Sequence, residues 1–321
     1  MTTFAKNSML AKHTAAGFGL QSSFGVEAST GLHWLPFEGQ IDYKLHANKQ
    51  YPTQGDYNAA GDHLQYSAGA WYEGGVPWIF TPSTSAMTDL LKWIFDRDSY
   101  DRGRYASVYK YGVFPGGALF REASMDVMVR EATFRFVKGR PVTVALGLIG
   151  RAPGAATPSV SMDTQSGPFL WSDVAATVSY GGETAAVDLD LEEAEIRIDN
   201  LVAGGEDGLR FDSSSYPALL ENHGAARVTG SVTRDFVDDK ITAAFLTRVT
   251  APFSHTDEAS LSFAIARGST SITLSVNGVD WQDPGPDFQG NNDSKIMQSG
   301  VPFKALASDD GTTPAIDYSI S

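Results

Sequence analysis

The sequence predicts a mainly β protein made of two sandwich- or barrel-like β units, at least one flanking helix, an extended arm and loops. Several segments alternate apolar and polar residues with a period of two, as half-buried strands do. The 32 glycines and 15 prolines indicate many turns, and only one segment, residues 83–98, has a convincing helical period. A hydrophobic content of 42% excludes disorder as the main state.

Residues 1–31 are small, polar and glycine-dotted, and we expect an arm there rather than a core element. Residues 32–150 form the first β unit. A polar loop with glycine and proline breakers is expected at residues 48–61. The strands expected in this unit are 32–37, 40–46, 64–72, 105–114, 124–137 and 142–149.

The helix at residues 83–98 carries one apolar face. Ser85 is the expected N-cap. We expect this face to cover the open side of a β-sandwich. The apolar residues at helical spacing are Met87, Leu90, Leu91, Trp93, Ile94 and Phe95.

Residues 151–168, rich in Pro, Gly, Ser, Thr and Ala, read as a linker to the second β unit, residues 169–321. A loop is expected at 204–215, a short helical turn at 216–221 and a short apolar segment at 241–246. The strands expected in this unit are 185–191, 194–199, 227–236, 259–266, 271–279 and 301–306.

The two units share an order of parts. Residues 133–139 align with 261–268, and residues 142–147 align with 272–277, as the two arms of a hairpin in each unit. We interpret this similarity as divergent duplication in preference to coincidence.

Composition limits the classes of function. The formal charge is −14, with 24 basic against 38 acidic residues and no basic run, which argues against sequence-independent gripping of DNA. Such a surface would let DNA pass without sticking, although acidity also simply keeps proteins soluble. No apolar run approaches the ~20 residues of a membrane span, and the N-terminus lacks a signal-peptide pattern. The absence of cysteine excludes disulfides and thiolate sites, and we expect folding in the cytosol.

No catalytic, cofactor-binding or metal site is predicted, and the chain is not expected to be an enzyme. There is no Gly-x-Ser-x-Gly nucleophile motif. Gly17 and Gly19 lack the third glycine of a dinucleotide site. No His-x-x-x-His pair occurs among the scattered histidines, which are His13, His33, His46, His63, His223 and His255.

Three further groups of residues could form functional sites, but we favour a structural interpretation for each. A polar loop that misses the EF-hand pattern could ligate calcium, but a solvated loop is expected; its residues are Asp283, Asp287, Asn291, Asn292 and Asp293. Acidic residues could be paired glycosidase carboxylates, but the wet face of a strand is expected; they are Asp188, Asp190, Glu192, Glu193 and Glu195. Aromatic residues could stack on sugars, but core and subunit packing is expected; they are Tyr66, Trp71, Tyr72 and Trp78.

Segments spread over most of the chain resemble one family. They are residues 17–26 (GFGLQSSFGV), 195–200 (EIRIDN), 227–236 (RVTGSVTRDF), 298–306 (QSGVPFKAL) and 313–318 (TPAIDY). In order and spacing they resemble the tail tube proteins of long-tailed, siphovirus-type bacteriophages, the roughly 300-residue family. The first half departs from the family pattern before its helix.

The resemblance implies a structural virion protein, made in the host cytoplasm, that forms stacked rings around a channel for genome delivery. The implied partners are other copies in trimeric or hexameric rings, a tape-measure protein inside the tube, and the tail terminator and distal tail proteins. If the duplication is real, three chains close a ring that elsewhere needs six. DNA would pass without specific binding, and neither a membrane nor a cofactor is implied.

Ring closure would pair edge strands that are otherwise exposed. We expect the arm 1–31 and the loop 48–61 to contact neighbouring rings. An acidic lumen would repel phosphates, with Asp188, Asp190, Glu193 and Glu195 as candidate lining residues. Two alternatives stay open: a distal tail or other hub component of a virion or contractile system, and a carbohydrate-binding or hydrolytic β-sandwich protein.

Overall fold

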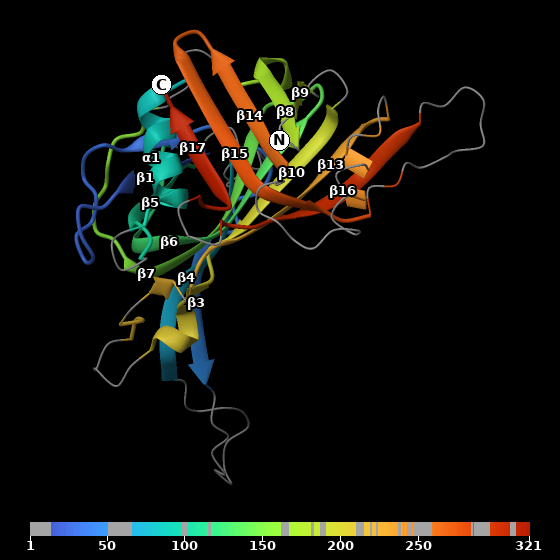
Figure 1. The fold of residues 1–321 in the computed structure, drawn as a ribbon. Coiled ribbons are helices and arrows are strands. Elements are labelled where there is room, and N and C mark those ends of the chain that lie inside the picture. The colour runs from blue at the N-terminus through green and yellow to red at the C-terminus, as the bar shows by residue number, and fades with distance from the viewer. Residues whose placement is uncertain are drawn as a thin grey trace, which may run out of the picture.

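The computed structural model is mainly β, with the α-helix α1 (Thr84–Phe95) and one large antiparallel sheet system in its described part. Figure 1 shows the fold. The residues that the structure describes are 14–50, 66–97, 102–114, 117–161, 167–180, 183–186, 191–209, 215–218, 220–222, 224–236, 239, 241–242, 245–246, 259–283, 285, 296–308 and 313–321.

A continuous run of strands, which we call the front sheet, crosses both halves of the chain. β6 joins the halves, since its residues 131–137 pair with residues 193–199 of β10. In order across the sheet, its strands are β3 (Lys44–Gln50), β4 (Tyr66–Ile79), β7 (Thr143–Pro153), β6 (Leu119–Val137), β10 (Leu191–Asp199), β13 (Arg227–Asp235) and β16 (Met297–Ala305).

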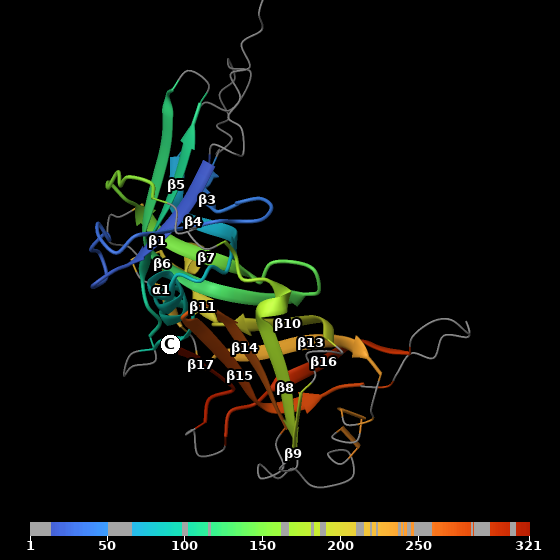
Figure 2. The ribbon, with the colours of Figure 1, turned by 90° about the horizontal axis from the view of Figure 1, so that it is seen from above.

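Two groups of elements lie behind the front sheet, one for each half, as Figure 2 shows from above. The first contains α1 (Thr84–Phe95), β1 (Thr14–Leu20), β2 (His33–Leu35) and β5 (Ala106–Val113). The second contains β8 (Val174–Tyr180), β9 (Glu183–Ala186), β14 (Ala259–Arg267), β15 (Thr270–Trp281) and β17 (Ile316–Ile320). The remaining short elements are η2 (Trp171–Asp173), β11 (Val202–Ala203), η3 (Gly205–Gly208) and β12 (Glu221–Asn222).

One main core fills the space between these layers and runs through both halves. The core is formed by the apolar side chains that alternate with polar ones along each front strand. On β10, for example, Ala194, Ile196 and Ile198 are all buried. At the junction, Phe136 of β6 stacks on Phe263 of β14 with ring centroids 4.5 Å apart. The two halves therefore share their hydrophobic interior.

The predicted helix is confirmed as α1, and its expected apolar face is buried except for Phe95, which is partly buried. Its first residue is Thr84 and its N-cap is Ser83, so the expectation that Ser85 caps it is wrong. Trp93 is anchored by a hydrogen bond from its indole Nε1 to the Val127 carbonyl (3.1 Å). Burial of the face, rather than a side-chain cap, stabilises this helix.

The expectation of an arm is wrong for residues 14–20, which form the buried strand β1 between β2 and β5. The glycines that suggested an arm permit close packing instead. A Cβ on Gly17 would lie 2.7 Å from the His33 carbonyl oxygen, and one on Gly19 would lie 2.5 Å from the Leu32 side chain. Residues 1–13 lie outside the described residues.

Other boundaries also shift. The strand expected at 40–46 begins at Lys44 and continues to Gln50, so residues 48–50 are strand, and the rest of the predicted loop to residue 61 lies outside the described residues. Residues 151–153 of the predicted linker belong to β7. The helical turn expected at 216–221 is wrong, because its described residues are bends and coil that lead into β12.

The hairpins that suggested duplication both form, as β6–β7 and β14–β15. Gly139 and Gly268 occupy their turns with φ of 79° and 63°, which glycine adopts without strain. The duplication and the domain limits at 31, 150 and 168 remain predictions. Among the described residues, no helix is both long and apolar enough for a membrane span.

Candidate functional site: the exposed face and edges of the front sheet

The outward face of the front sheet is polar and charged. On β10 the residues that alternate with the buried ones are Glu193, Glu195 and Arg197, of which Glu195 is half-buried and the other two are exposed. The register places Glu195 opposite Arg135 on β6 and opposite Ser231 on β13. Period-two alternation therefore positions a charged surface across the junction of the two halves.

Ion pairs connect charged side chains on this face and at its rim. Arg135 Nε lies 2.8 Å from Glu195 Oε2, and Arg197 Nη2 lies 2.7 Å from Glu131 Oε2. The other pairs are Arg130–Glu73, Lys138–Glu192 and Arg140–Glu38. The face therefore carries interleaved charges of both signs.

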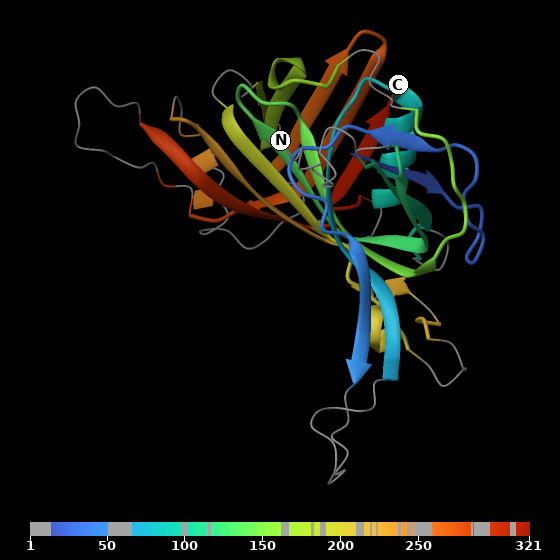
Figure 3. The ribbon, with the colours of Figure 1, turned by 180° about the vertical axis from the view of Figure 1, so that it is seen from behind.

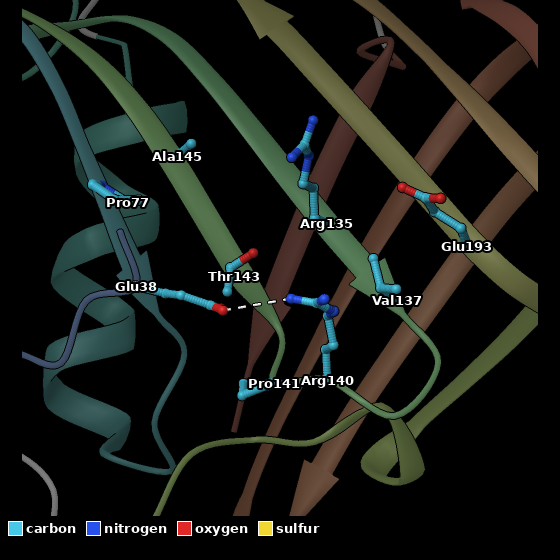
Figure 4. Close-up of a pocket in the computed structure, with 9 residues that line it drawn as sticks. All are labelled: Glu38, Pro77, Arg135, Val137, Arg140, Pro141, Thr143, Ala145 and Glu193. Atoms are coloured by element: carbon cyan, nitrogen blue, oxygen red, sulfur yellow. Dashed lines mark ion pairs between the residues drawn. The ribbon is translucent and has the colours of Figure 1, made fainter. Parts of the chain in front are cut away.

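A shallow hollow of about 420 Å³ lies at one end of this face (Figure 4). Small side chains of β4 and β7 line it, and Arg140 reaches across toward Glu38, with 3.6 Å between Nη1 and Oε1. The lining residues are Glu38, Pro77, Arg135, Val137, Arg140, Pro141, Thr143, Ala145 and Glu193. These groups offer charges and hydrogen bonds to whatever contacts this part of the face.

The hairpin of β3 and β4 projects from the body of the molecule (Figures 1 and 3). Its base is fixed by Tyr43, whose hydroxyl lies 2.8 Å from Ser124 Oγ and whose ring stacks on Tyr72. Burial raises the pKa of Tyr43 well above its usual value. Farther along, burial opposes ionisation of Glu73, but hydrogen bonds from Trp71 and Arg130 outweigh it and lower the pKa of that carboxyl. Tyr43 is therefore a neutral anchor and Glu73 a charged one.

The two outer strands of the front sheet offer backbone edges. β3 pairs with β4 and with no other described strand. β16 pairs with β13 along most of its length but with β15 only through residues 303–305. Leu45 on β3 is 44% exposed although it is a large apolar residue. Edges of this kind are templates for pairing with another chain.

The predicted lining acids divide into two groups. Glu193 and Glu195 lie on the outward face as expected for a wet strand face, and Glu195 is neutralised by Arg135. Asp188 and Asp190 lie outside the described residues. Glu192 pairs with Lys138 at 2.5 Å between Nζ and Oε1.

The candidate metal ligands do not gather in the described part of the chain, where no three His, Asp or Glu side chains form a metal-sized group. His33 is buried and its Nε2 lies 3.0 Å from Asp89 Oδ2, while His46 stacks on Trp71. The other histidines lie outside the described residues, as do all the predicted calcium ligands except Asp283.

Most of the described aromatic candidates are packing residues. Tyr72 and Trp78 are buried in the main core, which confirms the packing interpretation for them. Trp71 is half-buried, stacks on His46 and donates to Glu73 at 3.0 Å. The side chain of Tyr66 lies outside the described residues.

Sequence reasoning missed a buried ion pair beside the loop 21–31. Asp126, whose side chain is 0% exposed, accepts hydrogen bonds from Arg151 Nε and the Gly25 amide, each at 2.7 Å. Arg151 also lies over the Phe24 ring, 5.0 Å from its centroid. The only local sign in the sequence was one acidic residue among the apolar residues 125–129. This sign does not identify the residue with which Asp126 pairs.

Comparison with protein families gives a match over most of the chain. A family model described as phage tail tube protein matches residues 15–305, which include every strand of the front sheet. No curated protein matches the sequence.

Proposed function

This chain belongs to the phage tail tube protein family, and we propose that its copies polymerise edge to edge into stacked rings whose hollow centre is the channel for genome delivery. As a member of this family it is a structural component of the virion. The polar outward face of the front sheet would line the channel, and its apolar face is already covered by α1 and the second layer.

The outer strands of the front sheet carry this proposal. Among the described strands, β3 pairs only with β4, and β16 pairs with β15 only through residues 303–305, so β3 and the first part of β16 have backbone groups available for pairing. Joining β3 of one copy to β16 of the next would continue the same sheet around a ring, as β6 and β10 already join the two halves within one chain. Either three chains with two equivalent units each, or six chains, would close such a ring.

The projecting β3–β4 hairpin supports stacking of the rings. It extends beyond the other front strands, as Figure 3 shows, and it presents Leu45 to solvent. A neighbouring ring would bury this surface. We also propose that the tail is of the siphovirus type. The proposed partners are a tape-measure protein inside the tube and terminator and distal tail proteins at its ends.

Leu45→Pro tests edge pairing. The Asp42 amide donates to the Gly75 carbonyl at 3.2 Å, so alternation along the ladder directs the Leu45 amide away from β4, to the edge. Proline removes that donor and leaves the β3–β4 ladder intact. We expect wild-type protein to form rings and tubes in electron micrographs and the variant to remain a folded monomer.

Leu45→Thr is the matched control, because it removes the same apolar side chain but keeps the edge amide. It should assemble more fully than Leu45→Pro. Circular dichroism should show equal strand content in both variants. Tubes formed by Leu45→Pro as readily as by the control would contradict pairing through β3.

A further inference from the structure

Positive charges on the front sheet's outward face are matched by neighbouring carboxylates. Arg135 and Arg197 each form an ion pair across the β6–β10 junction, and Arg130 pairs with Glu73. The register also places Arg227 directly opposite Asp199 and Lys304 directly opposite Asp280. The chain as a whole has a formal charge of −14, so these paired arginines are a local feature of an acidic chain.

Stability does not account for this arrangement. The side chains of Arg135 and Arg197 are 56% and 54% exposed, and those of their partners Glu195 and Glu131 are 30% and 34% exposed. Ion pairs with so much solvent access contribute little to folding because water and salt screen them. Cross-strand pairs do favour one register, but apolar alternation already selects it.

The chemistry of the guanidinium group suggests another role. Its planar fork binds phosphate oxygens in the same geometry as carboxylate oxygens, and each phosphate contact on DNA gains from counterion release. In this structure Glu195 and Glu131 occupy part of each fork, at 2.8 Å and 2.7 Å. A phosphate would have to displace a carboxylate that is held beside the arginine by the sheet itself.

We propose that Glu131 and Glu195 mask Arg197 and Arg135 from DNA, so that the face resists binding through paired charges rather than through an acidic excess. This inference rests on the proposed function, in which the face lines the channel. On this proposal the channel surface is not uniformly negative; it carries arginines that are already paired with carboxylates of the same chain.

The proposal is tested by removing the carboxylates that pair with the two arginines. Fluorescence anisotropy with a short labelled DNA duplex is measured against salt concentration for soluble wild type, Glu195→Gln and Glu131→Gln/Glu195→Gln. We expect no salt-dependent binding by wild type. We expect binding at low salt by the variants, with the slope of log K against log salt steepening by roughly 0.9 for each uncovered arginine.

Two controls separate masking from net charge. Asp317→Asn removes one exposed carboxylate from β17 in the layer behind the front sheet, and should not bind DNA. Arg135→Gln/Glu195→Gln removes the uncovered cation and should return to wild-type behaviour. Three results would each overturn the proposal. The first is that Asp317→Asn binds DNA as well as Glu195→Gln does, and the second is that the Arg135→Gln/Glu195→Gln variant still binds. The third is that the Glu131→Gln/Glu195→Gln variant does not bind.

Electron micrographs of the same wild-type preparation test the proposed function separately. If no rings or tubes form under any condition, the proposed function fails, whereas the anisotropy series still decides whether the carboxylates mask the arginines. If tubes form and the glutamate variants do not bind the duplex, masking alone is wrong.

Discussion

Individual charged residues in this protein differ in their energetic role according to burial. Asp126 is completely buried and pairs with Arg151, whereas Glu195 is partly exposed and pairs with an exposed arginine. Removing one member of a buried pair leaves an uncompensated charge in a poorly solvated place. The same change at an exposed pair leaves a charge that water solvates.

We therefore expect Asp126→Asn to destabilise the fold by roughly 3 kcal/mol, the low end for buried pairs, because Arg151 keeps some access to water. Asparagine tolerates the left-handed backbone of Asp126 (φ 54°), so the change removes the charge and one of the two accepted hydrogen bonds without straining the backbone. Urea unfolding measures it as a lower midpoint with an unchanged slope. Glu195→Gln is the control, and a loss at Asp126 as small as at Glu195 would contradict this account.

The C-terminal strand β17 illustrates how an element of one half is fixed by the other. It pairs with β15 and packs against α1 of the first half. Tyr318 stacks on Phe95 with centroids 5.1 Å apart, and its hydroxyl donates to Asp96 Oδ1 at 2.8 Å. Burial and the Asp96 carboxylate raise the pKa of Tyr318 above its usual value, so the neutral phenol is the form that the fold favours.

Tyr318→Phe should cost about 1 kcal/mol, since it removes one hydrogen bond and keeps the ring stack. The hydroxyl's contribution is fully present below the ordinary tyrosine pKa of about 10 and is lost as pH rises through the raised value. Urea unfolding midpoints measured between neutral and alkaline pH test this expectation. The wild type should lose the stability contributed by the Tyr318 hydroxyl as pH rises, and Tyr318→Phe should not show that loss. Tyr111→Phe, at a half-buried tyrosine of β5, is the matched control.

At the scale of the whole molecule, the two halves share a sheet and a core. The β6–β10 ladder and the Phe136–Phe263 stack cross the boundary between them. A duplicated chain whose units fold independently would not need these contacts. The shared interior makes a single cooperative unit the physical expectation, even if the two units arose by duplication.

Calorimetry on the non-assembling Leu45→Pro variant should therefore show one transition, with equal calorimetric and van't Hoff enthalpies. A monomeric variant avoids the concentration dependence that assembly adds. Two resolved transitions would instead support separate domains at the boundaries predicted near residues 151–168.

Local pattern was enough to predict the mainly β class, α1, both hairpins and the wet faces of Glu193 and Glu195, because periodicity reports which side of an element meets water. It failed at β1, where the small residues 14–20 look like an arm, since their burial depends on Trp34 and β5, which lie farther along the chain. It also failed at Ser85, because burial of an apolar face set the helix start without a side-chain cap.

The sequence by itself determined the alternating faces, the amphipathic helix α1 and the family of this protein. Only the tertiary structure decided that Glu195 neutralises Arg135, 60 residues away, that Asp126 is buried with Arg151, and that β3 pairs only with β4 among the described strands. The reason is that a residue's face follows from its immediate neighbours, whereas its partner follows from the register between distant strands, which the whole core selects.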